Sequence, residues 1–210
     1  MQGKHVVVTG GKGALGTGVV ELLVARGATV HVADRPEVSL DREADAVAFY
    51  AGLPPIWASI HLVGGFAMAP IADLSLADFE GQWRLNAVTC FLSCREAVKS
   101  MRRGGGGGRI VNVAARPVLQ PTGGMLAYVA AKASVAAITQ SLAAEVVREN
   151  ILVNAVVPST IDTPANRAAM PRADHTLWPT PAELAETIAF LASPANTVTS
   201  GALVPVYGRA

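Results

Sequence analysis

The sequence predicts an α/β fold in which a doubly wound parallel β-sheet carries helices on both faces. Two observations predict it. Short apolar runs rich in β-branched residues alternate with longer helical patterns along all 210 residues. A glycine-rich turn joins the first of these runs to the first helical pattern. With 51% hydrophobic residues the chain can bury one substantial core, so we expect a single domain over residues 1–210.

The expected elements alternate between strand and helix. Val6-Val7-Val8 is a β-branched run that predicts a buried strand at 4–8. The helical pattern of 14–26 ends before Gly27, a residue type common just after a helix. A second strand is expected at 29–33, and a brief one at 38–40. The remaining expected elements are helix 41–51, strand 56–63, helix 75–102, strand 109–114, helix 125–149, strand 151–157, helix 181–192 and strand 202–206.

The turn after the first strand has the composition of a dinucleotide site. Gly10, Gly13 and Gly16 let the backbone turn tightly and approach a pyrophosphate, which the helix N-terminus then binds. An acidic residue such as Asp34, after the second strand, accepts hydrogen bonds from the ribose of NAD and repels the 2′-phosphate of NADP. We therefore expect a Rossmann-type fold that prefers NAD(H). NADP(H) stays possible because Arg35 follows, and a turn Asp is compatible with either cofactor.

Tyr128 and Lys132 form a candidate acid–base pair. Four residues apart on a helix, they project from one face, one turn from each other. A phenol holds its proton to a pKa near 10, and a neighbouring lysine cation favours the phenolate and lowers that pKa. An exposed i,i+4 pair without function is the alternative when the two residues are taken alone.

Together, the glycine turn and the Tyr-Lys pair resemble the short-chain dehydrogenase/reductase family, over nearly the whole chain. Further matches follow in order: Leu62-Val-Gly-Gly-Phe66, WRLNAVTCF around Asn86, the strand 109–114 and the segment 154–158. The resemblance implies three catalytic residues, Tyr128 as acid–base, Lys132 as its activator and ribose ligand, and Asn86 as the organiser of a water. An Asn that caps or bends the helix is the alternative for Asn86.

The resemblance also implies a set of cofactor-binding residues. Besides Tyr128 and Lys132, they are Gly10, Lys12, Gly13, Ala14, Leu15, Gly16, Asp34, Arg35, Val63, Gly64, Gly65, Pro158, Thr160, Ile161 and Thr163.

One residue of the family pattern is absent. The family has a serine thirteen positions before its tyrosine, and Ala115 stands there instead. That hydroxyl polarises the substrate carbonyl, and loss of one such donor typically costs about 10²–10³ in rate. Either the substrate needs no such donor, or the chain is a weak or inactive relative, or the donor is Arg116, Gln120 or Thr122.

The dihydropteridine reductase-like branch of the family also lacks the serine. This chain is similar to that branch in Gly10-Gly-Lys-Gly-Ala-Leu-Gly16, in the segment 161–171 with Trp178 after it, and in a short stretch at 34–55. Asn86 and Phe66 depart from the branch. The short stretch implies that one helix beside the adenine is missing and that this side of the cofactor site is open.

The segment of about 158–180 is expected to be a loop that closes over nicotinamide and substrate. Some of its residues could serve only to anchor the loop. Candidate substrate contacts are Phe66, Ala115, Arg116, Asn166, Arg167, Met170 and Trp178.

Composition bounds the remaining expectations. The net charge of +1 predicts no nucleic-acid partner and no membrane binding, and no apolar run is expected to reach the ~18 residues of a membrane span. The early first strand predicts no signal peptide and a cytoplasmic protein. Gly104–Gly108 is expected to be a linker. No metal site is expected. The four histidines, His5, His31, His61 and His175, show no ligand spacing, and Cys90 and Cys94 are expected to be small packing residues.

The sequence therefore favours an NAD(P)-dependent oxidoreductase that transfers hydride between nicotinamide and a small carbonyl or alcohol. A pteridine-like substrate competes within that class. A non-catalytic dinucleotide-binding relative and an interaction scaffold are the other classes. In each case the resemblance implies a homodimer or homotetramer paired through helices 75–102 and 125–149.

Overall fold

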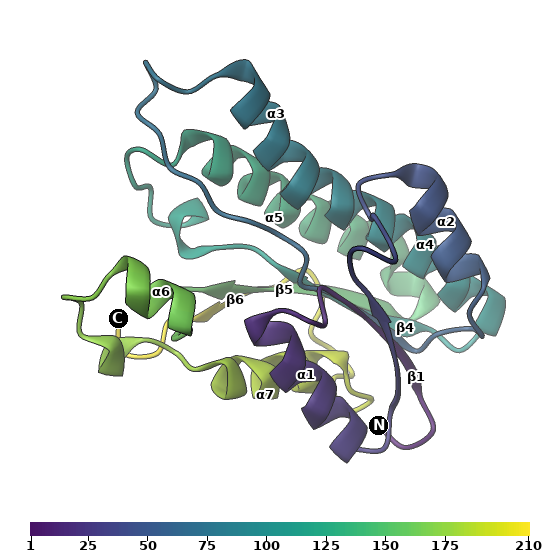
Figure 1. The fold of residues 1–210 in the computed structure, drawn as a ribbon. Coiled ribbons are helices and arrows are strands. Elements are labelled where there is room, and N and C mark those ends of the chain that lie inside the picture. Colours follow the sequence, from purple (N-terminus) through teal and green to yellow (C-terminus); the bar gives the residue numbers. More distant parts are fainter.

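Six parallel strands form the centre of the molecule in the computed structural model, which describes all 210 residues (Figure 1). Their order across the sheet is β2-β1-β3-β4-β5-β6. The predicted α/β fold with a parallel sheet is confirmed. The strands are β1 (His5–Thr9), β2 (Thr29–Ala33), β3 (Ala58–His61), β4 (Gly108–Val113), β5 (Ile151–Pro158) and β6 (Leu203–Val206).

The direction of the winding changes at β1. From β1 the chain runs outward to β2, and then returns to place β3 on the other side of β1. In open parallel sheets such a reversal leaves a crevice beyond the carboxyl ends of the two strands. Here those ends are Thr9 and His61, which are partners in the register of β1 and β3. The topology alone therefore predicts a ligand site beyond these two residues.

Helices cover both faces of the sheet (Figure 1). On one face, α1 (Ala14–Ala25) packs against α7 (Pro181–Ala192). On the other lie α4 (Thr89–Gly104) and α5 (Leu126–Val146), with α2 (Glu43–Ala51) beside α4 and α3 (Leu76–Trp83) beside α5. Val6 and Val8 belong to the core under α1 and α7, whereas Val7 belongs to the core under α4 and α5. Strand alternation explains why all three valines are buried.

The expected helix 75–102 is three segments in the structure. A π-helical segment, η1 (Arg84–Val88), separates α3 from α4. Asn86 lies inside it, and its side chain is hydrogen-bonded to Gly65 of the loop after β3. π-helical turns are frequent at functional sites. The single-helix expectation is wrong because this tertiary contact leaves no signature in helical periodicity.

The stretch between β2 and β3 holds one helix, α2, as its length suggested. The brief strand expected at 38–40 does not form. Leu40 is buried instead against Ala46 of α2 and Leu92 of α4. The apolar residues of this segment therefore fix the loop to the helical layer rather than extend the sheet.

The segment Leu126–Glu149 has 24 residues, and an 18-residue window within it has a mean hydropathy of 1.2, which is long and apolar enough for a membrane span by those two measures. The expectation that no apolar run reaches such a length is therefore wrong. In the structure Ala131, Val135 and Ala143 of α5 are buried, and the last two lie in the core against the sheet. The apolar composition is thus that of a core helix.

Candidate active site

The glycine turn packs closely against the end of β3. Gly10 has a φ of +69°, and a β-carbon added to it would lie 3.0 Å from the backbone nitrogen of Val63. A β-carbon on Gly16 would lie 2.1 Å from the carbonyl oxygen of Gly10. Gly13 is the N-cap of α1 and provides no side-chain cap. The first N–H groups of α1 are thus left for an external acceptor, and the helix dipole favours an anion there.

A cavity of about 420 Å³ opens beside this turn, where the strand topology predicts it. Seven of the predicted cofactor residues line it: Gly10, Lys12, Gly13, Asp34, Arg35, Val63 and Gly64. The other lining residues were not predicted, because they are apolar or lie on loops and helices that only the fold brings together: Val38, Leu40, Asp41, Leu62, Leu85 and Thr89.

Asp34 lies on the wall of this cavity, directly after β2. Its Oδ2 accepts a hydrogen bond of 2.9 Å from the backbone N–H of Lys12, and its Oδ1 accepts one of 2.9 Å from the backbone N–H of Arg35. Both oxygens are thus oriented by the backbone, as in an Asp turn, and each keeps a lone pair for a further donor.

The two cations beside Asp34 are each paired with a carboxylate. Lys12 Nζ lies 2.8 Å from Glu37, and a guanidinium nitrogen of Arg35 lies 2.7 Å from Asp41. The Lys12 ammonium, by hydrogen bond, lowers the pKa of Glu37. Neither cation is therefore free to meet an added phosphate without breaking a pair.

Tyr128 and Lys132 lie one turn apart on α5. Lys132 is only 6% exposed, and its Nζ donates a hydrogen bond of 2.9 Å to the carbonyl oxygen of Val113, at the end of β4. The ring of Tyr128 meets that of Phe66 edge to face, with the centroids 5.0 Å apart at 88°. Lys132 Nζ is 5.9 Å from the centroid of the Tyr128 ring. The fold thus brings together three of the predicted residues from two separate segments.

Burial dominates the proton affinities of this pair. It raises the pKa of Tyr128 to about 12 and lowers that of Lys132 to about 8. The expectation that Lys132 lowers the pKa of Tyr128 does not hold in this structure, because desolvation of the phenol outweighs an ammonium that is itself desolvated. Tyr128 is therefore a neutral phenol at neutral pH.

Asn86 clamps the loop after β3. Its Oδ1 accepts from the N–H of Gly65 at 3.2 Å, and its Nδ2 donates to the carbonyl oxygen of Gly65 at 3.1 Å. A β-carbon on Gly64 would lie 2.7 Å from Asn86 Oδ1 and 3.1 Å from Lys132 Nζ. The Asn86 side chain is thus occupied by the backbone, and Gly64 lets the loop pass directly over the ammonium.

Ala115 follows β4 and is 4% exposed, so no hydroxyl replaces the family serine at that position. The three alternative donors make other contacts. Arg116 Nε donates to Gln120 Oε1 at 2.7 Å, and the guanidinium lies over the ring of Tyr207 at 4.9 Å. Thr122 Oγ1 donates weakly, at 3.4 Å, to the carbonyl oxygen of Gln120. Tyr207 near the C-terminus was not expected in this region.

The loop after β5 contains a short helix, α6 (Pro164–Ala169), which the sequence analysis did not predict. Thr163 is its N-cap and accepts from the N–H of Asn166, whose Nδ2 donates to the carbonyl oxygen of Ile161 at 2.8 Å. Arg167 pairs with Asp162, and Trp178 packs against His175. Thr163, Asn166 and Arg167 therefore fix the loop, while Pro158 ends β5 and Thr160 follows half-buried.

Comparison with known sequences places this geometry in a family. Residues 51–208 match the family described as enoyl-(acyl carrier protein) reductase. A 2,5-dichloro-2,5-cyclohexadiene-1,4-diol dehydrogenase of Sphingobium indicum is 32% identical over 199 residues, covering 81% of this chain and 77% of that protein. A D-threitol dehydrogenase of Mycolicibacterium smegmatis is 33% identical over 192 residues, covering 87% and 72%. The chain spans only 33% of an uncharacterized short-chain type dehydrogenase/reductase of Sinorhizobium fredii, at 32% identity.

Two solved structures share the fold. A short-chain type dehydrogenase/reductase from Mycobacterium ulcerans superposes with a TM-score of 0.92 at 23% identity, covering 100% of this chain and 90% of that one. Levodione reductase superposes with a TM-score of 0.91 at 23% identity, covering 99% and 97%. The sequence relatives have the names of oxidoreductases, and the family match covers residues 51–208. This chain therefore belongs to the short-chain dehydrogenase/reductase family.

Proposed function

We propose that the chain is an NAD(H)-dependent oxidoreductase that interconverts a small carbonyl compound and its alcohol, with Tyr128 as the proton-exchanging residue. The observation that carries the proposal is the packing of Lys132 under Gly64, at the wall of a 420 Å³ cavity, with Tyr128 one turn away on α5. A functionless surface pair would not be buried against a loop that only glycine permits.

The residues around the cavity fit a dinucleotide. The glycine turn admits close approach of a backbone or phosphate, and the uncapped start of α1 offers N–H donors to a pyrophosphate. Asp34 is oriented to accept from a ribose hydroxyl. When bound, the nicotinamide supplies the hydride chemistry. Ala14, Leu15, Gly65, Ile161 and Thr163 remain proposed contacts on the strength of the family resemblance.

The cofactor preference for NAD(H) over NADP(H) rests on charge. Asp34 would face a 2′-phosphate directly, and Lys12 and Arg35 are already held by Glu37 and Asp41. A 2′-phosphate would add negative charge to a wall with three carboxylates and two neutralised cations. The single helix on this side leaves the adenine pocket more open than is usual in the family, so we expect modest affinity.

Each residue near the reacting carbonyl has a separate role in the proposed proton transfer. Tyr128, neutral at pH 7, donates its proton to the developing oxyanion of a carbonyl. Lys132 is charged below about pH 8 and stabilises the phenolate that remains. Val113 fixes the position of the ammonium, and Asn86 fixes the loop above it through Gly65. Asn86 therefore acts as a positioning residue, and water organisation by it stays a prediction.

The proposed substrate is small and carries a hydroxyl or carbonyl group. By their names, the two dehydrogenases among the relatives act on a cyclic diol and on threitol. Phe66 and Ala115 are proposed to form apolar walls beside Tyr128, and Arg116 to form a polar one. The segment 158–180 is proposed to close over the substrate, with Trp178 and Met170 as contacts.

A dihydropteridine reductase-like activity is the second candidate, and Ala115 is the observation that favours it, because that branch also lacks the serine. Ala115→Ser separates the two. If an ordinary carbonyl is the substrate, the restored hydroxyl should raise kcat, by up to about 10²-fold. If the natural substrate needs no such donor, Ala115→Ser should leave kcat unchanged or lower it.

Self-association is proposed through the outer surface of α3, α4 and α5, the helices that pair subunits in the family. Large apolar side chains are exposed there: Leu76, Trp83, Phe91 and Leu126. Light scattering at micromolar concentration should give a dimer or tetramer, and a monomer would contradict this assignment.

The proposed function is tested by turnover with a panel of diols, ketones, 3-oxoacyl thioesters and quinonoid dihydropteridine, with NADH and NADPH in parallel. The expected result is turnover of one class with NADH that is lost in Tyr128→Phe. If both nucleotides fail to bind at millimolar concentration, the non-catalytic interpretation replaces this one.

A further inference from the structure

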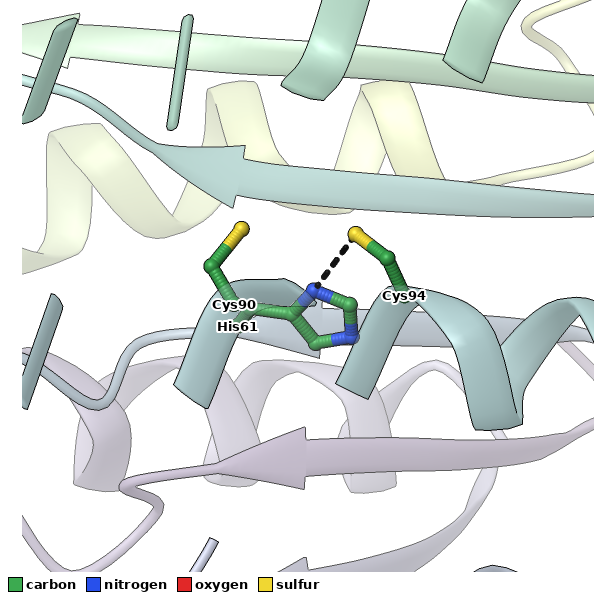
Figure 2. Close-up of side chains that lie close together, drawn as sticks. All are labelled: His61, Cys90 and Cys94. Carbon is green, nitrogen blue, oxygen red and sulfur yellow. Dashed lines mark hydrogen bonds between the residues drawn. The ribbon is translucent and has the colours of Figure 1, made fainter. Parts of the chain in front are cut away.

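The core of the molecule contains a second group of reactive side chains. His61 ends β3, and Cys90 and Cys94 lie one turn apart on α4. Their ligand atoms all lie within 4.8 Å of one another, and Figure 2 shows the imidazole between the two thiols. We propose that His61, Cys90 and Cys94 form a buried binding site for a thiophilic d¹⁰ cation, of which Zn²⁺ is the probe. This inference is independent of the proposed oxidoreductase activity.

The separations already suit such an ion. Cys94 Sγ lies 3.6 Å from His61 Nδ1. For a tetrahedral ion with Zn–S of about 2.3 Å and Zn–N of about 2.0–2.1 Å, the sulfur and nitrogen should be about 3.5 Å apart. Cys90 and Cys94 have the i,i+4 spacing with which two ligands on one helix face share a metal in helical zinc motifs. To complete three positions the Cys90 thiol needs a shift of about 1 Å, and the Asn112 amide has to withdraw from His61 Nδ1.

The charges of the site balance when an ion is bound. Two thiolates and a neutral imidazole around a divalent cation sum to zero, so burial of the loaded site carries little desolvation cost. Binding therefore releases the two thiol protons.

A hydrogen-bonded chain holds the imidazole in place. Tyr50 contacts Ser59 Oγ at 2.8 Å, Ser59 Oγ contacts His61 Nε2 at 2.8 Å, and His61 Nδ1 contacts Asn112 Oδ1 at 2.7 Å. Asn112 Nδ2 donates to Thr139 at 2.9 Å, which fixes its Oδ1 as the acceptor and His61 Nδ1 as the donor. Such outer partners orient metal-binding histidines.

The donors and acceptors of this hydrogen-bonded chain can also be reversed, and metal binding to His61 Nδ1 requires that reversal. With Nδ1 deprotonated and bound to the ion, His61 Nε2 carries the proton and donates to Ser59. Tyr50 then turns to Ser93, which is its other hydrogen-bond partner. Asn112 Oδ1, which lies 2.7 Å from His61 Nδ1 and accepts from Cys94 Sγ at 3.5 Å, then loses both of these donors. The imidazole thus changes tautomer without a net change in its protons.

The site lies behind one wall of the cofactor-sized cavity. Leu62 adjoins His61 and Thr89 adjoins Cys90 in the sequence, and both line the 420 Å³ cavity. The three ligands themselves do not line it and are buried.

Metal titration of the full-length, chelator-treated protein tests the proposal. We expect one equivalent of Zn²⁺ to bind with release of two protons, and a rise in Tm on binding. Co²⁺ in its place should give a thiolate-to-metal charge-transfer band. Cys94→Ser and His61→Asn should each weaken Zn²⁺ binding by at least about 10–100-fold.

The matched control is the His5–His31 pair, whose ring nitrogens lie 3.0 Å apart on β1 and β2 and which is the other pair of neighbouring imidazoles that could attract zinc. His31→Asn should leave the binding unchanged. Zn²⁺ binding that is lost in His31→Asn and retained in Cys94→Ser would overturn the proposal. The Co²⁺ spectrum uses the unaltered chain, so absence of the charge-transfer band also overturns it, whatever the folding of the variants.

Discussion

The two ends of the candidate active site are held together by different interactions. At the inner end, Asn86 and Lys132 are buried and bonded to backbone carbonyls of Gly65 and Val113. At the outer end, the pairs Lys12–Glu37 and Arg35–Asp41 hold more than half-exposed cations. Exposed pairs are worth about 0–1 kcal/mol, whereas a buried polar group that loses its partner costs about 1–3 kcal/mol. The inner end therefore tolerates little change, and the outer end can alter its selectivity without loss of the fold.

The largest expected effect is at the inner end. Tyr128→Phe removes the proton donor but keeps the ring that packs against Phe66, so kcat should fall by about 10²–10⁴. NADH binding and Tm should stay near those of the parent. Steady-state kinetics and nucleotide titration check this, and a variant that keeps full activity would remove Tyr128 from the mechanism.

A methyl group added beside Lys132 should have the next largest effect. In Gly64→Ala the β-carbon would lie 2.7 Å from Asn86 Oδ1 and 3.1 Å from Lys132 Nζ, so one of these two side chains must move. We expect kcat to fall about 10–100-fold, because small misplacements of catalytic groups are costly. Gly18→Ala is the control: it meets no atom within 4 Å and lies in a helix, where the substitution should stabilise by about 0.5–1 kcal/mol.

At the outer end the expected change is in selectivity. Glu37→Gln frees Lys12 for a 2′-phosphate, and the ratio of kcat/KM for NADPH to that for NADH should rise by about 10-fold, or 1.4 kcal/mol. Tm should hardly change. Glu43→Gln is the matched control, because its exposed carboxylate pairs with Arg95, a residue that does not line the cavity. Equal ratios in both variants would contradict the proposed role of Glu37.

The smallest expected effect is a pH dependence of stability. Burial, and then the facing His5, lower the pKa of His31 below 6.5. The unfolded chain therefore binds this proton more readily than the folded one, so stability is lost as the pH falls below about 6.5. Thermal melts between pH 7 and 5 should show a smaller loss for His31→Asn than for the parent.

The sequence predicts well where local signals agree with the fold. Helix 181–192 has the predicted limits, because Pro181 and the capping box of Thr180 and Glu183 fix its start. The glycine turn and Asp34 likewise line the cavity as predicted, since their positions follow from strand, turn and helix order.

What the sequence does not reveal depends on contacts between distant segments. In the π-helical turn Asn86 is hydrogen-bonded to Gly65, and α6 starts inside a loop at its N-cap Thr163. The pKa of Tyr128 depends on burial, which the spacing from Lys132 does not report. His61 shows no ligand spacing to the cysteines along the chain, and only the fold brings the three together. The i,i+4 spacing of Cys90 and Cys94 on a helix was the one available signal.

The most direct test of the central claim is NADH turnover by the parent and Tyr128→Phe side by side, with NADH binding measured for both. The account predicts equal NADH affinity and a kcat about 10²–10⁴ lower in Tyr128→Phe. Equal kcat in the two proteins, or no NADH binding to either, would contradict it.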